Sequence, residues 1–157
     1  MDNLLEEQLT KHYNTIWKQV EYITNNVPRS ALDIVIDKKT IFFRLYHILE
    51  TAEFYLQENP NDMKWGDHIG IDYEKTKTED SIAKMKNYTN DQLLAYLNDV
   101  KDETGSKFKE AAYSDKSDFK WLDNNLDKYF YLMRHCNWHL GEIYSLLKGK
   151  GILINWR

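Results

Sequence analysis

The sequence predicts an all-α fold, a four-helix bundle with one long crossover between its second and third helices. Only six glycines and two prolines occur among 157 residues, so turns are few and the regular elements are long. Leucine occurs 17 times and valine 4 times, which favours helices over sheets. Four long segments carry apolar residues at helical spacing. Residues 1–157 are therefore expected to form a single domain.

The first expected helix spans Asn3–Thr24. Leu9, Ile16 and Val20 fall at helical spacing and define its buried face. The segment Asn25–Pro28 follows directly, and a proline preceded by two asparagines is a typical helix stop. The helix should therefore end near residue 24.

The second expected helix, Thr40–Gln57, is apolar almost all round, which places it at the centre of the domain. Before it lies a connection in which Leu32–Asp37 is extended or partly ordered. After it, from Glu58 to Tyr88, the helical pattern lapses, apart from a short helix expected at Ser81–Lys86. Loops of this length are usually functional or crossover segments.

A capping box opens the third expected helix, Thr89–Ala112, because Thr89 and Gln92 have the required spacing. The fourth expected helix spans Asn125–Lys148 and stops at Gly149. Each of the two helices carries one apolar stripe. A sheet of three or more strands would contradict this fold.

Charge and cysteine content exclude several classes of function. The net charge of −4 argues against binding to nucleic acid or to anionic membranes. Cys136 is the only cysteine, which excludes an intramolecular disulfide and fits a reducing compartment. The start of the chain lacks signal-peptide features, and no uncharged apolar stretch approaches the roughly 20 residues of a membrane helix. A cytoplasmic protein is expected.

Histidines carry the strongest chemical signal. His135 and His139 lie one turn apart on the fourth expected helix, and Glu142 belongs to the same strip at the edge of the core stripe. Two imidazoles at this spacing can bind one metal ion. His47, the only histidine of the second expected helix, is either a core histidine with a hydrogen-bond partner or the third ligand. Together these residues predict a three-histidine metal site.

Two other kinds of histidine-containing metal site do not fit this sequence. A ferritin-like site needs Glu-x-x-His on two helices, and no histidine here has Glu three residues before it. A zincin needs Glu directly after its first histidine, where this chain has Cys136. We interpret Cys136, on the core stripe, as a buried hydrophobic residue rather than a nucleophile. His68 is interpreted as an exposed loop residue and His12 as a residue without a chemical role.

Three segments together resemble the DinB-like (DinB/YfiT) superfamily. They are Ile41–His47, the helix start Thr89–Leu94, and His135–Ile143 with its His-x3-His-x-Gly-Glu-Ile pattern. The resemblance covers nearly the whole chain, including the terminal Leu146–Gly149 and a tail near Trp156. It implies a four-helix bundle with a long crossover, often assembled as a homodimer.

The resemblance also implies a function. His47, His135 and His139 would bind a divalent metal ion, zinc or nickel foremost and manganese or iron as further candidates. Some members are thiol (S-)transferases that use a low-molecular-weight thiol, and one is related to amide-type hydrolases. The position after the glycine, commonly Gln, is Glu142 here. Its carboxylate can be a fourth ligand, a support for a ligand, or a catalytic general base.

Both reactions can use the same three ligands. Three neutral imidazoles leave the charge of the metal available, so that a bound thiol or water loses its proton near neutral pH. The expected pocket residues for a small-molecule substrate are Trp65, Asp67, His68, Tyr46, Trp138 and Trp156. The alternative is a non-catalytic metal- or ligand-binding protein of the stress response. An open metal position beside a cavity would favour catalysis.

Overall fold

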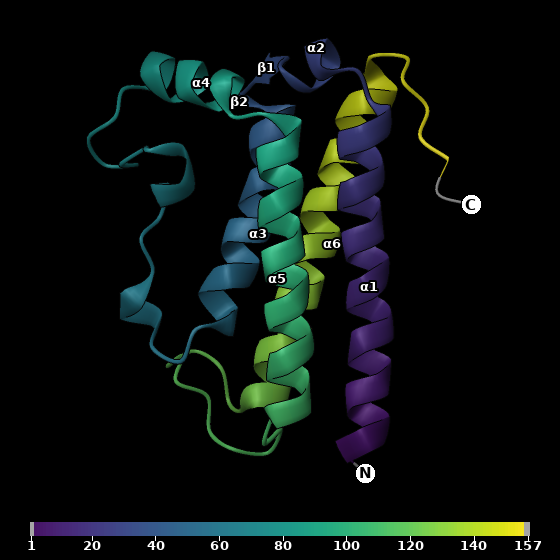
Figure 1. Cartoon of the computed structure of the whole chain (residues 1–157), viewed down its shortest axis with the longest axis vertical. Coiled ribbons are helices and arrows are strands. Elements are labelled where there is room, and N and C mark those ends of the chain that lie inside the picture. The colour runs from purple at the N-terminus through teal and green to yellow at the C-terminus, as the bar shows by residue number, and fades with distance from the viewer. Residues whose placement is uncertain (1, 156–157) are drawn as a thin grey trace.

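The computed structural model describes residues 2–155, which are predominantly helical. Four long helices run side by side (Figure 1): α1 (Asp2–Asn26), α3 (Ile41–Leu56), α5 (Asn90–Glu110) and α6 (Asn125–Gly149). Their observed ends lie within two residues of the predicted ones. The predicted all-α class is confirmed.

Short elements occupy the connections. Part of the expected extended segment, Val35–Ile36, pairs with Lys39–Thr40 in a two-stranded antiparallel hairpin, the only sheet within residues 2–155. The short helix expected in the crossover is longer than predicted. These elements are α2 (Arg29–Leu32), β1 (Val35–Ile36), β2 (Lys39–Thr40), the 3₁₀ turns η1 (Pro60–Asp62) and η2 (Asp67–Ile69), and α4 (Thr78–Asn87).

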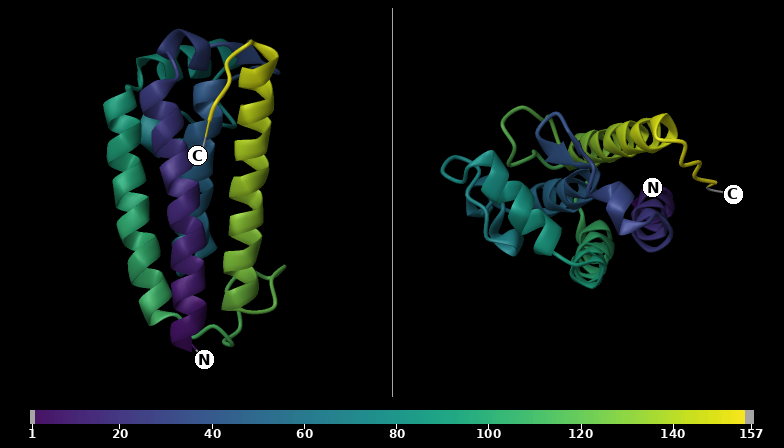
Figure 2. Two further views of the ribbon diagram at one scale, coloured as in Figure 1. Left: turned by 90° about the vertical axis from the view of Figure 1, so that its right-hand side faces the viewer. Right: turned by 90° about the horizontal axis from the view of Figure 1, so that it is seen from above.

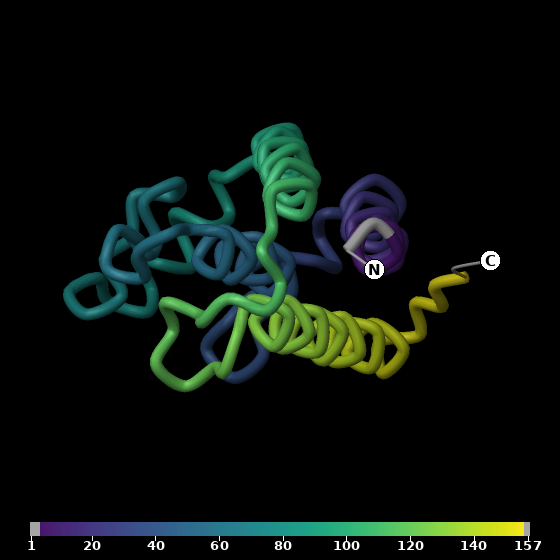
Figure 3. The backbone as a smooth tube through the Cα atoms, turned by 90° about the horizontal axis from the view of Figure 1, so that it is seen from below, coloured from purple at the N-terminus to yellow at the C-terminus, as the bar shows by residue number. Residues whose placement is uncertain are grey.

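The long helices form a ring in which α1 and α3 each pack against both α5 and α6. In Figure 1, α1 and α6 ascend while α3 and α5 descend. The crossover, residues 57–77, returns beside α3 on the side away from α1, as the end-on views show (Figures 2 and 3). The hairpin and α4 lie together at one end of the helices.

Capping residues fix where the helices begin. The Thr40 hydroxyl accepts a hydrogen bond from Phe43 N at the start of α3. The predicted capping box of Thr89 and Gln92 is present at the start of α5. Such caps typically contribute about 1 kcal/mol each. The cap of α3 lies two turns before His47 and therefore sets the position of that side chain.

The core lies between the four helices. Trp17 of α1, Tyr46 of α3 and Phe108 of α5 are among the largest side chains that are almost fully buried. Burying such a side chain stabilises the fold by roughly 1.5–3 kcal/mol. Two charged residues of α3, Arg44 and Glu50, are buried with this apolar material. Buried charges need partners, and their partners lead to the site described next.

None of the helices within the described chain combines the length and apolar character needed to cross a membrane.

Candidate metal centre

Three histidines converge between α3 and α6. One ring nitrogen from each of His47, His135 and His139 can be chosen such that all lie within 4.8 Å of one another. The ring centroids are separated by 5.8 Å (His47–His135), 5.0 Å (His47–His139) and 4.6 Å (His135–His139). The predicted convergence of the three rings is confirmed, because α3 and α6 pack against each other at this level.

Two ring nitrogens of this cluster have no partner. Nε2 of His135 and Nε2 of His139 are buried and accept or donate no hydrogen bond in the part of the chain that the structure describes. Buried polar atoms are nearly always paired, so two such atoms in one cluster call for an explanation. A divalent ion would provide one, because neutral imidazole nitrogens are typical ligands of zinc and of other divalent metals.

Burial keeps the imidazoles of His135 and His139 neutral. Burial, together with the neighbouring His139 and His47, lowers the pKa of His135 to about 4. Burial also lowers the pKa of His139, although Glu142 opposes the shift. The neutral ring is the form that binds metals. At neutral pH these two rings are therefore available without displacement of a proton.

Glu142 supports His139. Its Oε2 lies 3.1 Å from Nδ1 of His139, and its Oε1 accepts a hydrogen bond from Nε of Arg44 at 3.0 Å. A proton on Nδ1 leaves Nε2 of the same ring free to bind a metal. Although burial acts to raise the pKa of Glu142, the bonds from Arg44 and His139 lower it overall. Both carboxylate oxygens are thus engaged, as expected for a ligand support.

Arg44 connects this support to the hairpin. Its Nη1 donates to the carbonyl oxygens of Lys39 and Thr40, both at 3.2 Å, and its Nη2 donates to that of Ile36 at 3.1 Å. Only 5% of Arg44 is exposed. One guanidinium therefore holds the hairpin and Glu142 at the same time. This role of Arg44 was not predicted from the sequence, although a single arginine in an otherwise apolar stretch was the available signal.

Glu50 is a second buried acidic or basic residue beside the histidine cluster, and its role was not predicted from the sequence either. Its side chain accepts hydrogen bonds from the hydroxyls of Tyr46 (3.1 Å) and Tyr73 (2.8 Å) and from the backbone N of Gly66 (2.5 Å). Its Oε2 lies 3.8 Å from Nδ1 of His47. Glu50 thereby joins the crossover to the helix that carries His47. A carboxylate three residues after a histidine on a buried helix was the available signal.

Two openings reach the histidines. A pocket of about 250 Å³, which we call the metal pocket, is lined by Asp37, Lys39, Phe43, Arg44, His47, Trp138, His139 and Glu142. A groove of about 320 Å³ on the His135 side is lined by Tyr131, Arg134, His135 and Trp138. Trp138 contributes to both and is 66% exposed. The cluster is therefore open to small molecules.

The predicted pocket residues are only partly correct. Trp138 lines the metal pocket, and the ring of Trp65 lies 6.4 Å from that of His47. Tyr46 is instead buried in the core, where it donates to a carboxylate. His68 and Asp67 do not line the metal pocket. The hairpin takes their place, because Arg44 holds it beside α6.

The other residues that the sequence analysis named are not part of the metal centre. His68 is exposed as predicted and pairs with Glu53 at 3.1 Å. His12 is exposed on α1. Cys136 is fully buried, and burial raises the pKa of its thiol to about 12. Trp156 lies outside the described residues.

Comparisons of the chain with models of known protein families, with curated proteins and with solved structures gave no match. Its function is therefore inferred from the side chains of the metal centre and from the pockets beside them.

Proposed function

We propose that the chain is a DinB-like four-helix bundle that binds one divalent metal ion through His47, His135 and His139. We further propose that it uses the ion as a metal-dependent thiol (S-)transferase on a small molecule. The observation that carries both proposals is the pair of buried Nε2 atoms, unpartnered among the described residues, in a three-histidine cluster. His47 and His139 of this cluster line the metal pocket, and His135 lines the groove on the other side.

A catalytic role is favoured over a purely structural one by the available ligands. Structural zinc sites have four protein ligands, whereas catalytic sites keep a position open. The two candidates for a fourth ligand are engaged elsewhere, Glu142 with Arg44 and His139, and His68 with Glu53. Three ligands beside a pocket fit a centre that accepts a further molecule.

A divalent ion held by three neutral imidazoles would keep its full charge and hold a bound thiol as a thiolate near neutral pH. The chain itself supplies orientation and shape. Glu142 fixes the ring of His139 and Arg44 fixes Glu142, while the ring of Trp138, 4.6 Å from that of His139, lines the metal pocket. In the transfer, the sulfur forms a bond to an electrophilic carbon, whose leaving group departs with the bonding electron pair. No general base in the pocket is required for that step.

Hydrolysis is the second candidate, and Asp37 is the observation that favours it. Its carboxylate lines the metal pocket and is engaged in no hydrogen bond or ion pair within residues 2–155. A water-activating mechanism would use such a group as a general base. Asp37→Asn should abolish a hydrolase activity and leave thiol transfer largely unchanged.

Metal binding is tested first, on protein purified without a histidine tag. Metal analysis and titration with Co²⁺ should give one ion per chain, with absorption bands typical of nitrogen ligands. His139→Ala should abolish tight binding, because two imidazoles cannot hold the ion at comparable affinity. The matched control His12→Ala removes an exposed histidine of α1 and should bind like the unaltered protein. Equal binding by both variants would refute the site.

Catalytic activity and oligomeric state are tested next. A screen of low-molecular-weight thiols with the metal-loaded protein should reveal transfer, and Glu142→Gln should retain most metal binding while changing the rate. Metal binding without turnover of any thiol or amide substrate would instead support the non-catalytic alternative. We also propose a homodimer, which light scattering at tens of micromolar protein will distinguish from a monomer.

A further inference from the structure

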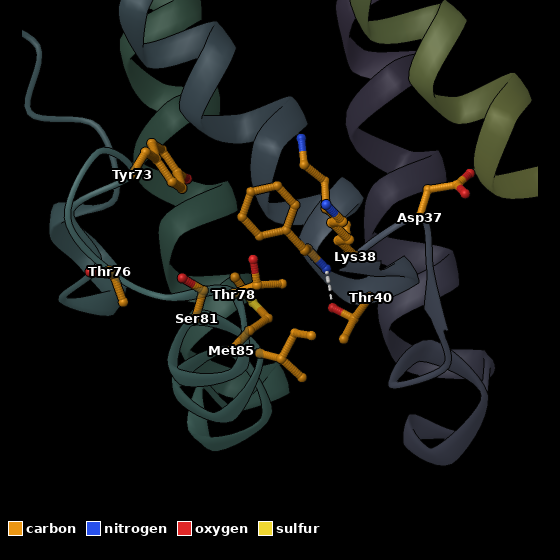
Figure 4. A pocket seen from close by; sticks show the side chains of 11 residues that line it. Asp37, Lys38, Thr40, Tyr73, Thr76, Thr78, Ser81 and Met85 are labelled. Carbon is orange, nitrogen blue, oxygen red and sulfur yellow. Dashed lines mark hydrogen bonds between the residues drawn. The ribbon is translucent and has the colours of Figure 1, made fainter.

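A second pocket adjoins the metal pocket. It has a volume of about 300 Å³ and lies between the hairpin and α4 (Figure 4); we call it the hairpin pocket. Its lining includes Asp37, Lys39 and Phe43, which also line the metal pocket. The two pockets therefore meet along these three residues.

Phe43 separates the hairpin pocket from the metal ligands. Its ring stacks on that of His47, with centroids 6.2 Å apart and planes inclined by 8°. The ring of Tyr73 meets it edge-on at 6.0 Å, and Nζ of Lys39 lies 5.1 Å from its centroid. A molecule bound at the histidines needs to pass only one aromatic ring to reach the hairpin pocket.

Apolar side chains and cations line the hairpin pocket. Phe43, Ile82 and Met85 provide apolar surface, while Lys38 and Lys39 provide two ammonium groups. The only carboxylate of the lining, that of Asp37, points toward α6 and away from the α4 side of the pocket (Figure 4). The lining of the hairpin pocket therefore carries two lysines against one carboxylate, and that carboxylate is turned away from the α4 side.

Hydroxyl groups lie across from the lysines. Thr78 and Ser81, on the α4 side in Figure 4, have side-chain oxygens without a hydrogen-bond partner among the described residues. They remain available as donors to an anionic group. Lys38 likewise forms no ion pair in the described chain.

The hairpin turn that presents these charges is strained. Asp37 and Lys38 have φ values of 52° and 65°, in the left-handed region where Asn and Gly are usual. A left-handed non-glycine residue costs roughly 1–2 kcal/mol, and such residues cluster at ligand sites. Two adjacent charged residues in this conformation fit a turn whose side chains contact a ligand.

We propose that the hairpin pocket holds the non-reacting end of the substrate, an aliphatic or aromatic group that ends in an anion, either a carboxylate or a phosphate. Lys38 and Lys39 would bind the anion, and Phe43, Ile82 and Met85 would contact the apolar part. This inference rests on the proposed function, because it assigns the reacting end of the same molecule to the histidines.

The first experiment needs no metal. Octanoate, octyl phosphate, octanol and octylamine are titrated separately into the metal-free protein, and backbone amide shifts are followed by NMR. Octanoate or octyl phosphate should shift the amides around Lys38 and Ser81, and the stronger of the two identifies the anion. Equal shifts from octanol and octylamine, or shifts confined to other regions, would overturn the proposal.

The second experiment uses the Co²⁺-loaded protein and a series of ω-mercapto carboxylates with matched mercapto alcohols. Beyond a certain chain length, the carboxylate should bind about three- to fivefold more tightly than the alcohol, as expected for an exposed ion pair. Lys38→Gln and Lys39→Gln should reduce this preference, whereas the exposed Lys11→Gln on α1 should retain it. The preference should also weaken at 1 M salt.

The two experiments separate the two proposals. If no thiol binds cobalt but octanoate still shifts the hairpin amides, the proposed function fails and the hairpin pocket stands. If thiols bind cobalt without any preference for the carboxylate at any chain length, the metal centre stands and the hairpin pocket is not the substrate's second subsite.

Discussion

Arg44→Met tests whether one buried arginine supports the metal centre. Methionine keeps an apolar side chain of comparable length but removes every donor of the guanidinium. Three backbone carbonyls, those of Ile36, Lys39 and Thr40, then lose a hydrogen bond, and Glu142 loses its partner on Oε1. The hairpin and Glu142 are both expected to loosen.

The size of the effect follows from these contacts. Breaking a buried charge pair typically costs 3–5 kcal/mol, and a hydrogen bond from a charged donor about 1.5–3 kcal/mol. Water replaces part of this loss, because Glu142 and two of the carbonyl contacts are only partly buried. We expect a loss of about 3 kcal/mol, which at a urea m-value of about 2 kcal/mol/M lowers the unfolding midpoint by roughly 1.5 M.

Metal affinity provides the second measurement. Loss of a group that orients a metal ligand typically weakens metal binding 10–100-fold. If Arg44 acts through Glu142, Arg44→Met and Glu142→Ala, which removes the carboxylate altogether, should not be additive in metal affinity. The control Lys18→Met removes an exposed charge from α1 and should change neither quantity. An unaltered midpoint with unaltered affinity, or strictly additive effects, would refute the reasoning.

Three further outcomes are expected. Lowering the pH from 7 toward 4 should destabilise the metal-free protein, because His135 and His139 take up protons near pH 6.5 when unfolded but only at lower pH when folded. In urea unfolding, the free energy of unfolding of His135→Asn should fall less over this pH range than that of the unaltered protein. An equal fall would contradict the explanation by buried histidines. Gly66→Ala should destabilise the fold by about 2 kcal/mol or more, because Gly66 has φ 81° and an added Cβ would lie 2.2 Å from the carbonyl oxygen of Ile71. Thermal unfolding measures the loss, and an unchanged melting temperature would argue against this turn. Cys136 should react with a chromogenic disulfide reagent only after unfolding, because burial raises its pKa; rapid labelling of the folded protein would contradict its burial.

The long helices were predictable because apolar spacing and capping residues are local signals. Thr89 and Gln92 mark the start of α5, and α6 continues one residue past its predicted end, to Gly149. The hairpin was not predicted, because its turn has neither the Asn nor the Gly that normally indicates a two-residue turn. Its conformation depends instead on the bonds from Arg44, a residue that follows it in sequence.

The metal ligands were predictable for a related reason. His135 and His139 share one helix face, and His47 lies on the helix with the most continuous apolar surface. The pockets were not predictable, since they depend on where the hairpin and α4 pack against α3. The roles of Arg44 and Glu50 likewise depend on partners distant in sequence, such as Glu142 and Tyr73.

The arrangement of the ligands also has a consequence for biosynthesis. His47 lies on α3 and precedes His135 and His139 on α6 by almost 90 residues, so α6 must have left the ribosome before the three rings can meet. A metal ion that binds only the native state shifts the folding equilibrium toward the folded protein. Nascent or truncated chains that lack α6 would have a single histidine of the set and would not compete for the metal. Metal capture would thus report that synthesis has passed α6 and that α3 and α6 have packed against each other.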